Sequence, residues 1–247
     1  GGAQIVSGVG IGTVSTMNGG TQRIYGVGTV STMNGGTQIV SGVGTVSTMN
    51  GGAQDISGGG TGTISTMSGG GQWIYNRGSG WVGVLTGTGQ QNIFSGGTGT
   101  IITMNSGAQI VSGGGIGTVS TMNGGTQIIT GGGTAMDTTL YGGTQLILDG
   151  ATVKNTTIYG GTAIMLDASV VVDGLSMTGG TYLFGGVGGS YNIAGKFNFA
   201  GGDVDMTKAS DGTKPGTYET LTIAKLEQGG GTFIMDTDLA SESNSDK

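Results

Sequence analysis

Glutamine and apolar residues recur along this chain at nearly constant spacing. Aligning the chain on the tetrapeptide Gly-Gly-(Thr/Ala/Gly)-Gln and its close variants gives an anchor glutamine in nine successive units, at Gln4, Gln22, Gln38, Gln54, Gln72, Gln91, Gln109, Gln127 and Gln145. The series continues in degenerate form at Ala163 and Tyr182, and successive anchors lie 16 to 19 residues apart. Eleven such units predict a solenoid, because the period is too long for a hairpin and shorter than the usual helical or propeller repeat.

Three apolar rows accompany the anchors. One lies two residues after the anchor, at Val6, Ile24, Val40, Ile56, Ile74, Ile93, Val111, Ile129, Ile147, Met165 and Phe184. A second lies five residues before it, at Met17, Met33, Met49, Met67, Met104, Met122, Leu140, Ile158 and Met177, with Leu85 one residue out of step. A third is formed by Val14, Val30, Val46, Ile64, Ile101 and Val119. It fails at Asp137 and Asn155, where either a bulge shifts the register or the side chains do not point inward.

The residue directly after the anchor is expected to point outward. Arg23 and Asp55 occupy this place, and side chains alternate between the two faces of a strand. Glycine-rich corners separate the short strands, because glycine adopts positive φ without steric cost. We therefore predict an all-β, right-handed parallel β-helix of about eleven 16–19-residue coils. Because the anchors share the inward parity of the apolar row, they are expected to form a ladder of amide hydrogen bonds at a corner.

The chain changes in character after about residue 136. Only Arg23, Asp55 and Arg77 are charged before this point, whereas 8 basic and 14 acidic residues occur in the whole chain. From about residue 190 the anchor disappears. We therefore divide the chain into a repeat region, residues 1–190, and a C-terminal segment, residues 191–247, that caps the end of the solenoid.

Composition excludes several classes of protein. Sixty glycines with a single proline exclude collagen, which requires abundant proline. The absence of cysteine and histidine removes thiolate metal sites, imidazole bases and a Ser-His-Asp triad. A net charge of −6 with scattered basic residues disfavours nucleic acid. Since no run of about eighteen apolar residues occurs, this piece is not expected to insert into a membrane. We expect a protein that is not an enzyme and that binds no metal or cofactor.

Three segments carry a resemblance to a known family. The repeated GGTQIVSG at residues 35–42, the threonine-rich return at 137–143 and the tail at 231–240 resemble the passengers of AIDA-type, self-associating autotransporter adhesins. The tail looks like the start of the autochaperone segment of that family, so the C-terminal segment is expected to contain its beginning.

The resemblance implies a passenger domain that is secreted and displayed on the surface of a Gram-negative cell. It implies attachment to the outer membrane through a barrel outside this piece of chain. The implied function is adhesion and self-association, which lead to aggregation and biofilm. The implied partners are other copies of the chain, a host-cell receptor or glycan, and a heptosyltransferase that adds heptose to Ser or Thr.

Hydroxyl residues recur three residues after the anchor, just before a glycine and with outward parity. These candidate O-glycosylation sites are Ser7, Ser41, Ser57, Ser112 and Thr130. The alternative is that serine and threonine serve only the turn that begins there, since turns favour these residues.

The fifth repeat contains a group of bulky aromatic residues. Trp73, Tyr75 and Trp81 lie close to Arg77, and aromatic faces beside arginine suit a sugar or a partner surface. Residues 76–83 are expected to form a protruding loop. The alternative is an ordinary imperfection of the repeat, because isolated apolar residues are normal on protein surfaces.

Two further possibilities concern carboxylates and threonines. Asp203 and Asp205, like Asp236 and Asp238, are two residues apart and would share one face of a strand, but the sequence assembles no catalytic or calcium-binding set around them. Regular threonines on a flat solenoid face can bind ice, and an inert structural spacer would have the same surface. Ice binding and an inert spacer role remain alternatives to adhesion.

Overall fold

The computed structural model describes residues 2–185, 190–207 and 220–235. These residues form strands and turns that join in one 22-stranded sheet. The strands are β1 (Gly2–Val6), β2 (Ile11–Ile24), β3 (Val27–Val40), β4 (Val43–Met49), β5 (Ala53–Ile56), β6 (Thr61–Met67), β7 (Gly71–Ile74), β8 (Ser79–Leu85), β9 (Gln90–Ile93), β10 (Thr98–Met104), β11 (Ala108–Val111), β12 (Ile116–Met122), β13 (Thr126–Ile129), β14 (Thr134–Met136), β15 (Thr139–Leu140), β16 (Thr144–Ile147), β17 (Thr152–Ile158), β18 (Thr162–Met165), β19 (Val171–Phe184), β20 (Ser190–Asp205), β21 (Thr220–Gln228) and β22 (Thr232–Ile234).

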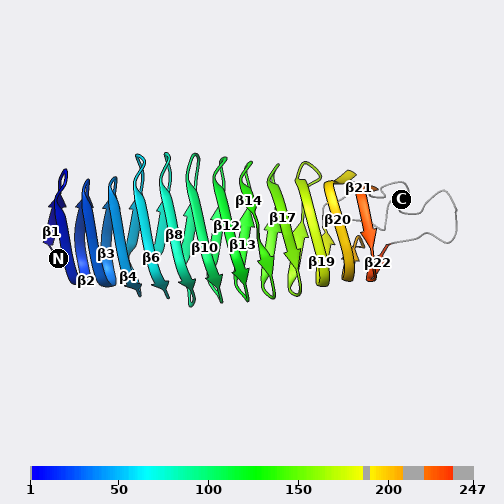
Figure 1. Cartoon of the computed structure of the whole chain (residues 1–247), viewed down its shortest axis with the longest axis horizontal. Helices are drawn as coiled ribbons and strands as arrows, with labels where there is room; N and C mark the ends of the chain where they lie inside the picture. The colour runs from blue at the N-terminus through cyan, green and yellow to red at the C-terminus, as the bar shows by residue number, and fades with distance from the viewer. Residues whose placement is uncertain (1, 186–189, 208–219, 236–247) are drawn as a thin grey trace.

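The strands wind into a rod in which each coil lies beside the next (Figure 1). All strand pairs are parallel among the described residues, and residues one period apart stand opposite each other: β5 pairs with β7 through Gln54 and Gln72, and β7 with β9 through Gln72 and Gln91. The predicted parallel β-solenoid of about eleven turns is therefore confirmed. The sequence repeat is the repeat of the coil.

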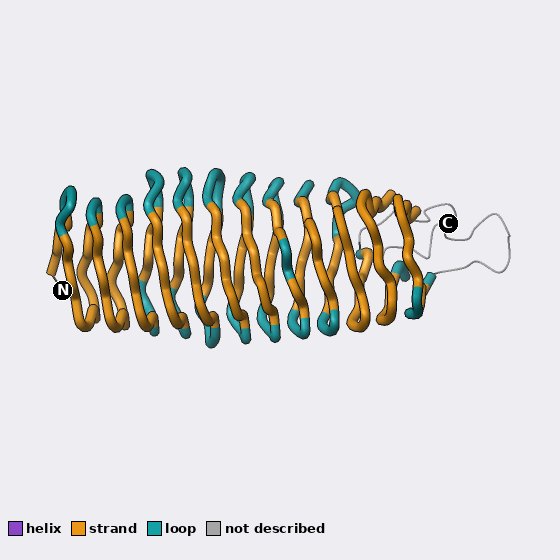
Figure 2. Tube along the Cα trace, viewed as in Figure 1, coloured by secondary structure: helices purple, strands orange, loops and turns teal. Residues whose placement is uncertain are grey.

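A typical coil contains one long and one short strand. β4 has seven residues and β5 has four, and turns separate them from each other and from the next coil. The pairing of β4 with β6 skips Ser47, so the long strand bends at that point. The turns gather along two edges of the rod (Figure 2). At one of them Gly58 and Gly59 take φ values of 61° and 82°, which a side chain would disfavour.

All three predicted apolar rows face the interior. Every residue of the first two rows is buried, and of the third row only Val14, near the open N-terminal end, is half-exposed. The alternation of inward and outward residues is thus confirmed along the repeat region. Side chains from neighbouring coils stack on one another and form a continuous hydrophobic core.

Two residues with positive φ explain why the third row fails. Asp137 and Asn155 take φ values of 50° and 54°, and the residues that follow them, Thr138 and Thr156, are 1% exposed. Asp137 and Asn155 point outward and the next residue, a threonine, enters the core, while the pairing register is the same before and after them. Outside, the Asn155 amide donates a hydrogen bond to the Asp137 carboxylate at 3.0 Å. Of the two alternatives, the second is correct: the side chains of Asp137 and Asn155 do not point inward.

The anchor glutamines form a buried amide ladder. In eight consecutive steps from Gln4 to Gln145, Nε2 of one glutamine donates to Oε1 of the glutamine one coil earlier, over 2.6 to 2.8 Å. The expected ladder is confirmed, but its expected place at a corner is wrong, because the glutamines lie inside the short strands. The ladder ends at Gln145, whose Oε1 has no partner among the described residues, since Ala163 follows it.

Glycine in the long strand makes room for this ladder. A Cβ on Gly62 would lie 2.2 Å from Ile56 Cδ1 and 2.5 Å from Gln54 Oε1. Later in the chain both positions change: the glutamine position becomes Ala163, and the glycine position becomes Ala135, then Val153 and Val172, all of them buried.

The core becomes aromatic towards the C-terminal end. Tyr182, Phe184, Tyr191, Phe197 and Phe199 are fully buried. β20 pairs in parallel with β19 and with both β21 and β22, so the pairing of the solenoid continues across the proposed boundary at residue 190. Residues 208–219 and 236–247 of the expected cap, including the second half of the tail at 231–240, lie outside the described residues, and the capping role of this segment stays a prediction.

Candidate functional site

The outer surface of the short strands is a regular face of the rod. We call it the short-strand face and define it by the two outward residues of each of β5, β7, β9, β11, β13, β16 and β18, and of the matching parts of β19 and β20. Parallel pairing places equivalent residues of successive coils directly beside each other.

An aliphatic ladder runs along the second half of this face. It consists of Ile110, Ile128, Leu146, Ile164 and Leu183, each paired with the next and each half-buried. A neighbouring row contains Ala108 and then threonines, at Thr126, Thr144, Thr162 and Thr181. These ten residues carry no charge, and the ladder ends where Leu183 pairs with Asp205. The sequence predicted outward residues here but did not identify them as an apolar stripe.

The candidate hydroxyl residues lie where a short strand meets a turn. Ser7 and Ser41 are exposed, whereas Ser57, Ser112 and Thr130 are half-buried. The carbonyl of Ser57 accepts a turn hydrogen bond from Gly60 at 3.0 Å, and the Thr130 hydroxyl donates to Asp149 Oδ2 at 2.7 Å. In other coils the same place is taken by Tyr25, Tyr75, Phe94, Leu148 and Leu166. The hydroxyl residues are therefore outward, as expected, but do not form an unbroken row.

The aromatic candidates are divided between two faces. Trp73 lies on the short-strand face in β7, and Tyr75 follows directly after that strand. Trp81 lies in β8, beyond the turn that contains Arg77, so the turn separates it from the other two aromatic residues. The expected loop over residues 76–83 is wrong, because β8 begins at Ser79 and only a tight turn precedes it.

Three neighbours of this group were not identified in the sequence analysis. Asp55 and Asn92 pair with Trp73 from the coils on either side. The ring of Phe94 lies 6.1 Å from that of Tyr75, at an angle of 40°. Desolvation raises the pKa of the Asp55 carboxyl, and desolvation together with the charge of Asp55 raises the pKa of Tyr75. The two side chains therefore interact electrostatically.

The acidic pair at Asp203 and Asp205 shares the outward face of β20, as predicted. Asp205 Oδ1 accepts hydrogen bonds from the backbone amide and the hydroxyl of Thr207, at 2.9 and 2.7 Å. Within the described ranges, no group of three or more Asp, Glu, His or Cys residues is placed to hold a metal ion. Asp236 and Asp238 lie outside the described residues.

Threonines recur three residues apart in the long strands, as at Thr45 and Thr48, but they do not form the single flat rank that binding to ice would require. Thr45 and Thr48 lie on either side of the bend at Ser47, whereas Thr61 and Thr63 both point outward from one straight segment. The regular spacing of three residues therefore places the two threonines of each pair on different surfaces.

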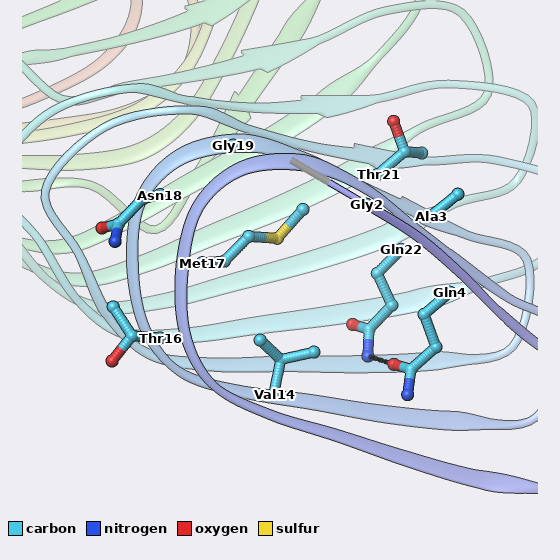
Figure 3. A pocket seen from close by; sticks show the side chains of 10 residues that line it. All are labelled: Gly2, Ala3, Gln4, Val14, Thr16, Met17, Asn18, Gly19, Thr21 and Gln22. Atoms are coloured by element: carbon cyan, nitrogen blue, oxygen red, sulfur yellow. Dashed lines mark hydrogen bonds between the residues drawn. The ribbon is translucent and has the colours of Figure 1, made fainter.

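The N-terminal end of the rod contains a hollow of about 500 Å³. Figure 3 shows Met17 and Val14 at this hollow, beside the hydrogen bond from Gln22 to Gln4 that begins the amide ladder. Elsewhere in the rod, a neighbouring coil covers the residues equivalent to Val14 and Met17. The hollow is thus the open end of the solenoid interior.

One solved structure is similar to this chain over nearly its whole length. It is the hyper-glycosylated fragment of TibA produced by TibC catalysis, with 24% sequence identity, a TM-score of 0.57, and coverage of 96% of this chain and 98% of the other. This likeness shows the fold. No protein-family model and no curated protein matches the chain. No helix long and apolar enough to cross a membrane occurs in the part of the chain that the structure describes.

Proposed function

We propose that this chain is the surface-displayed passenger of an autotransporter adhesin, with a binding rather than a catalytic role in adhesion and self-association of cells. The observation that carries the proposal is the aliphatic ladder, an uncharged and regular stripe on an exposed sheet face. The family resemblance of the repeat and the shared fold with the TibA fragment support it.

The ladder suits weak contact between two copies of the chain. Four steps at roughly 4.8 Å per strand give a stripe about 19 Å long, and four residues of strand give a width of about 13 Å. Two such stripes face to face would bury about 500 Å² in total, well below the roughly 1,200 Å² of a stable interface. Adhesion would therefore depend on many copies displayed together, each adding a weak contact.

The absence of charge on this stripe is what permits the contact. Neither copy would have to bury an unpaired charge, which is the most costly event at an interface. The threonine row beside the ladder supplies hydroxyl groups that can bond across the contact. A contact of this kind is isologous, because each copy offers the same surface to the other.

Lysine substitutions in the ladder test the proposal. Beads coated with the unsubstituted chain are expected to clump, and excess soluble chain is expected to disperse them. The double variant Ile128→Lys/Leu146→Lys is expected to abolish clumping, because it places two charges in the stripe. The control is Thr100→Lys/Thr118→Lys, which adds the same charge to paired, half-buried positions on β10 and β12. The role of the ladder would be refuted if both variants lost clumping equally. It would also be refuted if beads coated with the unsubstituted chain did not clump.

We further propose that Ser7, Ser41, Ser57, Ser112 and Thr130 are O-glycosylated with heptose. Their outward position at the edge of the rod supports this, as does the glycosylation of the similarly folded TibA fragment. Co-expression with TibC should add sugar masses to the intact protein, and the variant with alanine at all five positions should lose them. Unchanged mass addition in that variant would refute this assignment.

A further inference from the structure

We infer that the Trp73 region is a binding site for a neutral oligosaccharide. The site comprises Trp73, Tyr75 and Phe94 as aromatic contacts, with Asp55, Asn92 and Arg77 around them. The inference deepens the adhesive part of the proposed function and does not depend on self-association through the aliphatic ladder.

The Trp73 ring provides a flat platform. A Cβ on Gly71 would lie 2.2 to 2.8 Å from three atoms of the indole, so the ring lies down on the strand over this glycine. Trp73 is half-buried, and its remaining surface faces outward. The carbon-bound hydrogens of a sugar ring pack well on such a surface, because the face of an aromatic ring is electron-rich.

Tyr75 and Phe94 extend this platform towards the edge of the rod. Their ring centroids lie 6.1 Å apart with an angle of 40° between the planes, so neither ring covers the face of the other. Phe94 remains 38% exposed. In the adjoining coils, serine holds the same place, at Ser57 before them and Ser112 after them. Two successive coils therefore replace a small polar residue by an aromatic one, half-buried at Tyr75 and exposed at Phe94.

Hydrogen-bonding groups flank the Trp73 platform on both sides. The pairing of the short strands places Asp55, which is half-buried, in the coil before Trp73, and Asn92, which is only 7% exposed, in the coil after it. A carboxylate accepts hydrogen bonds from neighbouring hydroxyl groups, and an amide both donates and accepts. Aromatic faces bordered by such groups match a ligand that has apolar faces and a rim of hydroxyls.

The turn after Tyr75 departs from its neighbours in a way that points to function. The preceding turn uses Gly58 and Gly59 at positive φ, whereas this turn uses Asn76 at 49° and Arg77 at 67°. A residue with a Cβ is unfavourable in this conformation, and unfavourable backbone of this kind concentrates at functional sites. Here it presents the Arg77 side chain, with five hydrogen-bond donors, at the edge of the aromatic patch.

A hollow lies beside this turn. The backbone amides of Asn76 and Arg77 donate to Ser95 and Gly96 of the next turn, at 3.1 and 2.9 Å, rather than to the turn before. Between the two sides remains a hollow of about 540 Å³, a volume ordinary for a small-ligand site. It is lined by Gly58, Gly59, Asn76, Arg77, Ser95 and Gly96. Since Tyr75 and Phe94 directly precede Asn76 and Ser95, the hollow opens next to their rings.

The charges favour a neutral ligand. Asp55 and Arg77 contribute one charge of each sign to the site, and they are two of the three charged residues before residue 137. A ligand with several sulfates or carboxylates would meet Asp55 unfavourably, whereas hydroxyl groups can bond to both side chains. We therefore assign the site to neutral rather than acidic saccharides.

Binding is measured on the Ile128→Lys/Leu146→Lys variant, so that a failure of self-association cannot affect the result. The probes are immobilised neutral hexasaccharides of glucose, galactose, mannose and N-acetylglucosamine, together with their sulfated counterparts. We expect at least one neutral probe to be bound, and more tightly than its sulfated form. The chain has only two tryptophans, so Trp81→Phe leaves Trp73 as the single reporter, whose fluorescence should change on binding.

Three substitutions restore the residue that a neighbouring coil has at the same place: Tyr75→Ser, Phe94→Ser and Arg77→Gly. Each is expected to weaken binding by about tenfold or more. The matched control is Tyr25→Ser, which removes a tyrosine that is 58% exposed at the same place in another coil and should leave binding unchanged. The inference is overturned if no neutral probe is bound, if the sulfated probes bind more tightly, or if the three variants bind as the parent does. Bead aggregation is scored in a separate experiment, so that the outcome for self-association and the outcome for saccharide binding stay distinct.

Discussion

Replacing Gln72 by leucine would interrupt the amide ladder near its middle. Gln72 is fully buried. Its Nε2 donates to Gln54 Oε1 at 2.7 Å, and its Oε1 accepts from Gln91 Nε2 at 2.7 Å. Leucine is close to glutamine in size but supplies neither group. The variant therefore keeps most of the packing and leaves two buried polar atoms without their ladder partners.

The cost can be estimated from those two atoms. A buried polar group that loses its partner costs about 1–3 kcal/mol. Gln54 Oε1 loses its ladder donor, whereas Gln91 Nε2 keeps the Thr100 carbonyl at 3.4 Å. The variant should therefore lose about 2–4 kcal/mol in the free energy of unfolding. Gln4→Leu at the half-buried end of the ladder should lose less than about 1 kcal/mol, because Gln22 keeps the Gly12 carbonyl at 3.5 Å.

Chemical denaturation followed by two signals provides the assay. Circular dichroism reports the whole sheet, and with Trp81→Phe in both parent and variant the fluorescence of Trp73 reports β7, the strand that carries Gln72. Because coils of a solenoid contact mainly their neighbours, the fluorescence transition of the variant should move at least as far as the dichroism transition. A Gln72→Leu variant as stable as the parent, or destabilised no more than Gln4→Leu, would refute the reasoning.

Three further outcomes follow from the structure. Gly80→Ala should destabilise the fold by about 1–3 kcal/mol, because its Cβ would lie 2.2 Å from Ile74 Cδ1. The control is Gly19→Ala, whose Cβ would have no atom within 4 Å, and it should unfold at the parent's denaturant midpoint. Burial raises the pKa of Asp55 above 3.8, so its contribution to stability is present at low pH and is lost as the pH rises through the raised value. In the parent, this loss lowers the denaturation midpoint between pH 3.8 and neutral pH. The Asp55→Asn variant should show a smaller fall, and a pH profile identical to the parent's would contradict this assignment. Arg77→Gly should raise the free energy of unfolding by about 1 kcal/mol by relieving the left-handed conformation, and a lower midpoint would mean that the side chain stabilises the turn.

The repeat in the sequence was sufficient to predict the coil. Val40, Ile56 and Ile74 recur at one place of the repeat and are all buried, because an alternating strand can bury only one of its faces. The amide ladder was predictable for the same reason: Gln54 and Gln72 share the inward parity and are stacked by the parallel pairing. Only its location in the strand rather than at a corner required the structure.

The candidate sites were less accessible from the sequence. Ser57 and Trp73 were placed outward correctly, since this follows from parity alone. Phe94 was missed, although a comparison of residues three positions after each anchor would have found it beside Tyr75. The loop predicted over residues 76–83 was wrong because two residues with positive φ, Asn76 and Arg77, complete the turn and allow β8 to begin at once.

The sequence by itself determined the period, the inward rows and the parallel stacking, because these depend on alternation and glycine spacing, which are local and repeated. Tertiary structure decided what meets across coils and across the core. The Trp73 ring lies over Gly71 only because of the direction that its side chain takes. The entry of Thr138 into the core depends on the positive φ of Asp137. Such contacts depend on backbone conformation and side-chain direction in several coils at once, which no single repeat unit specifies.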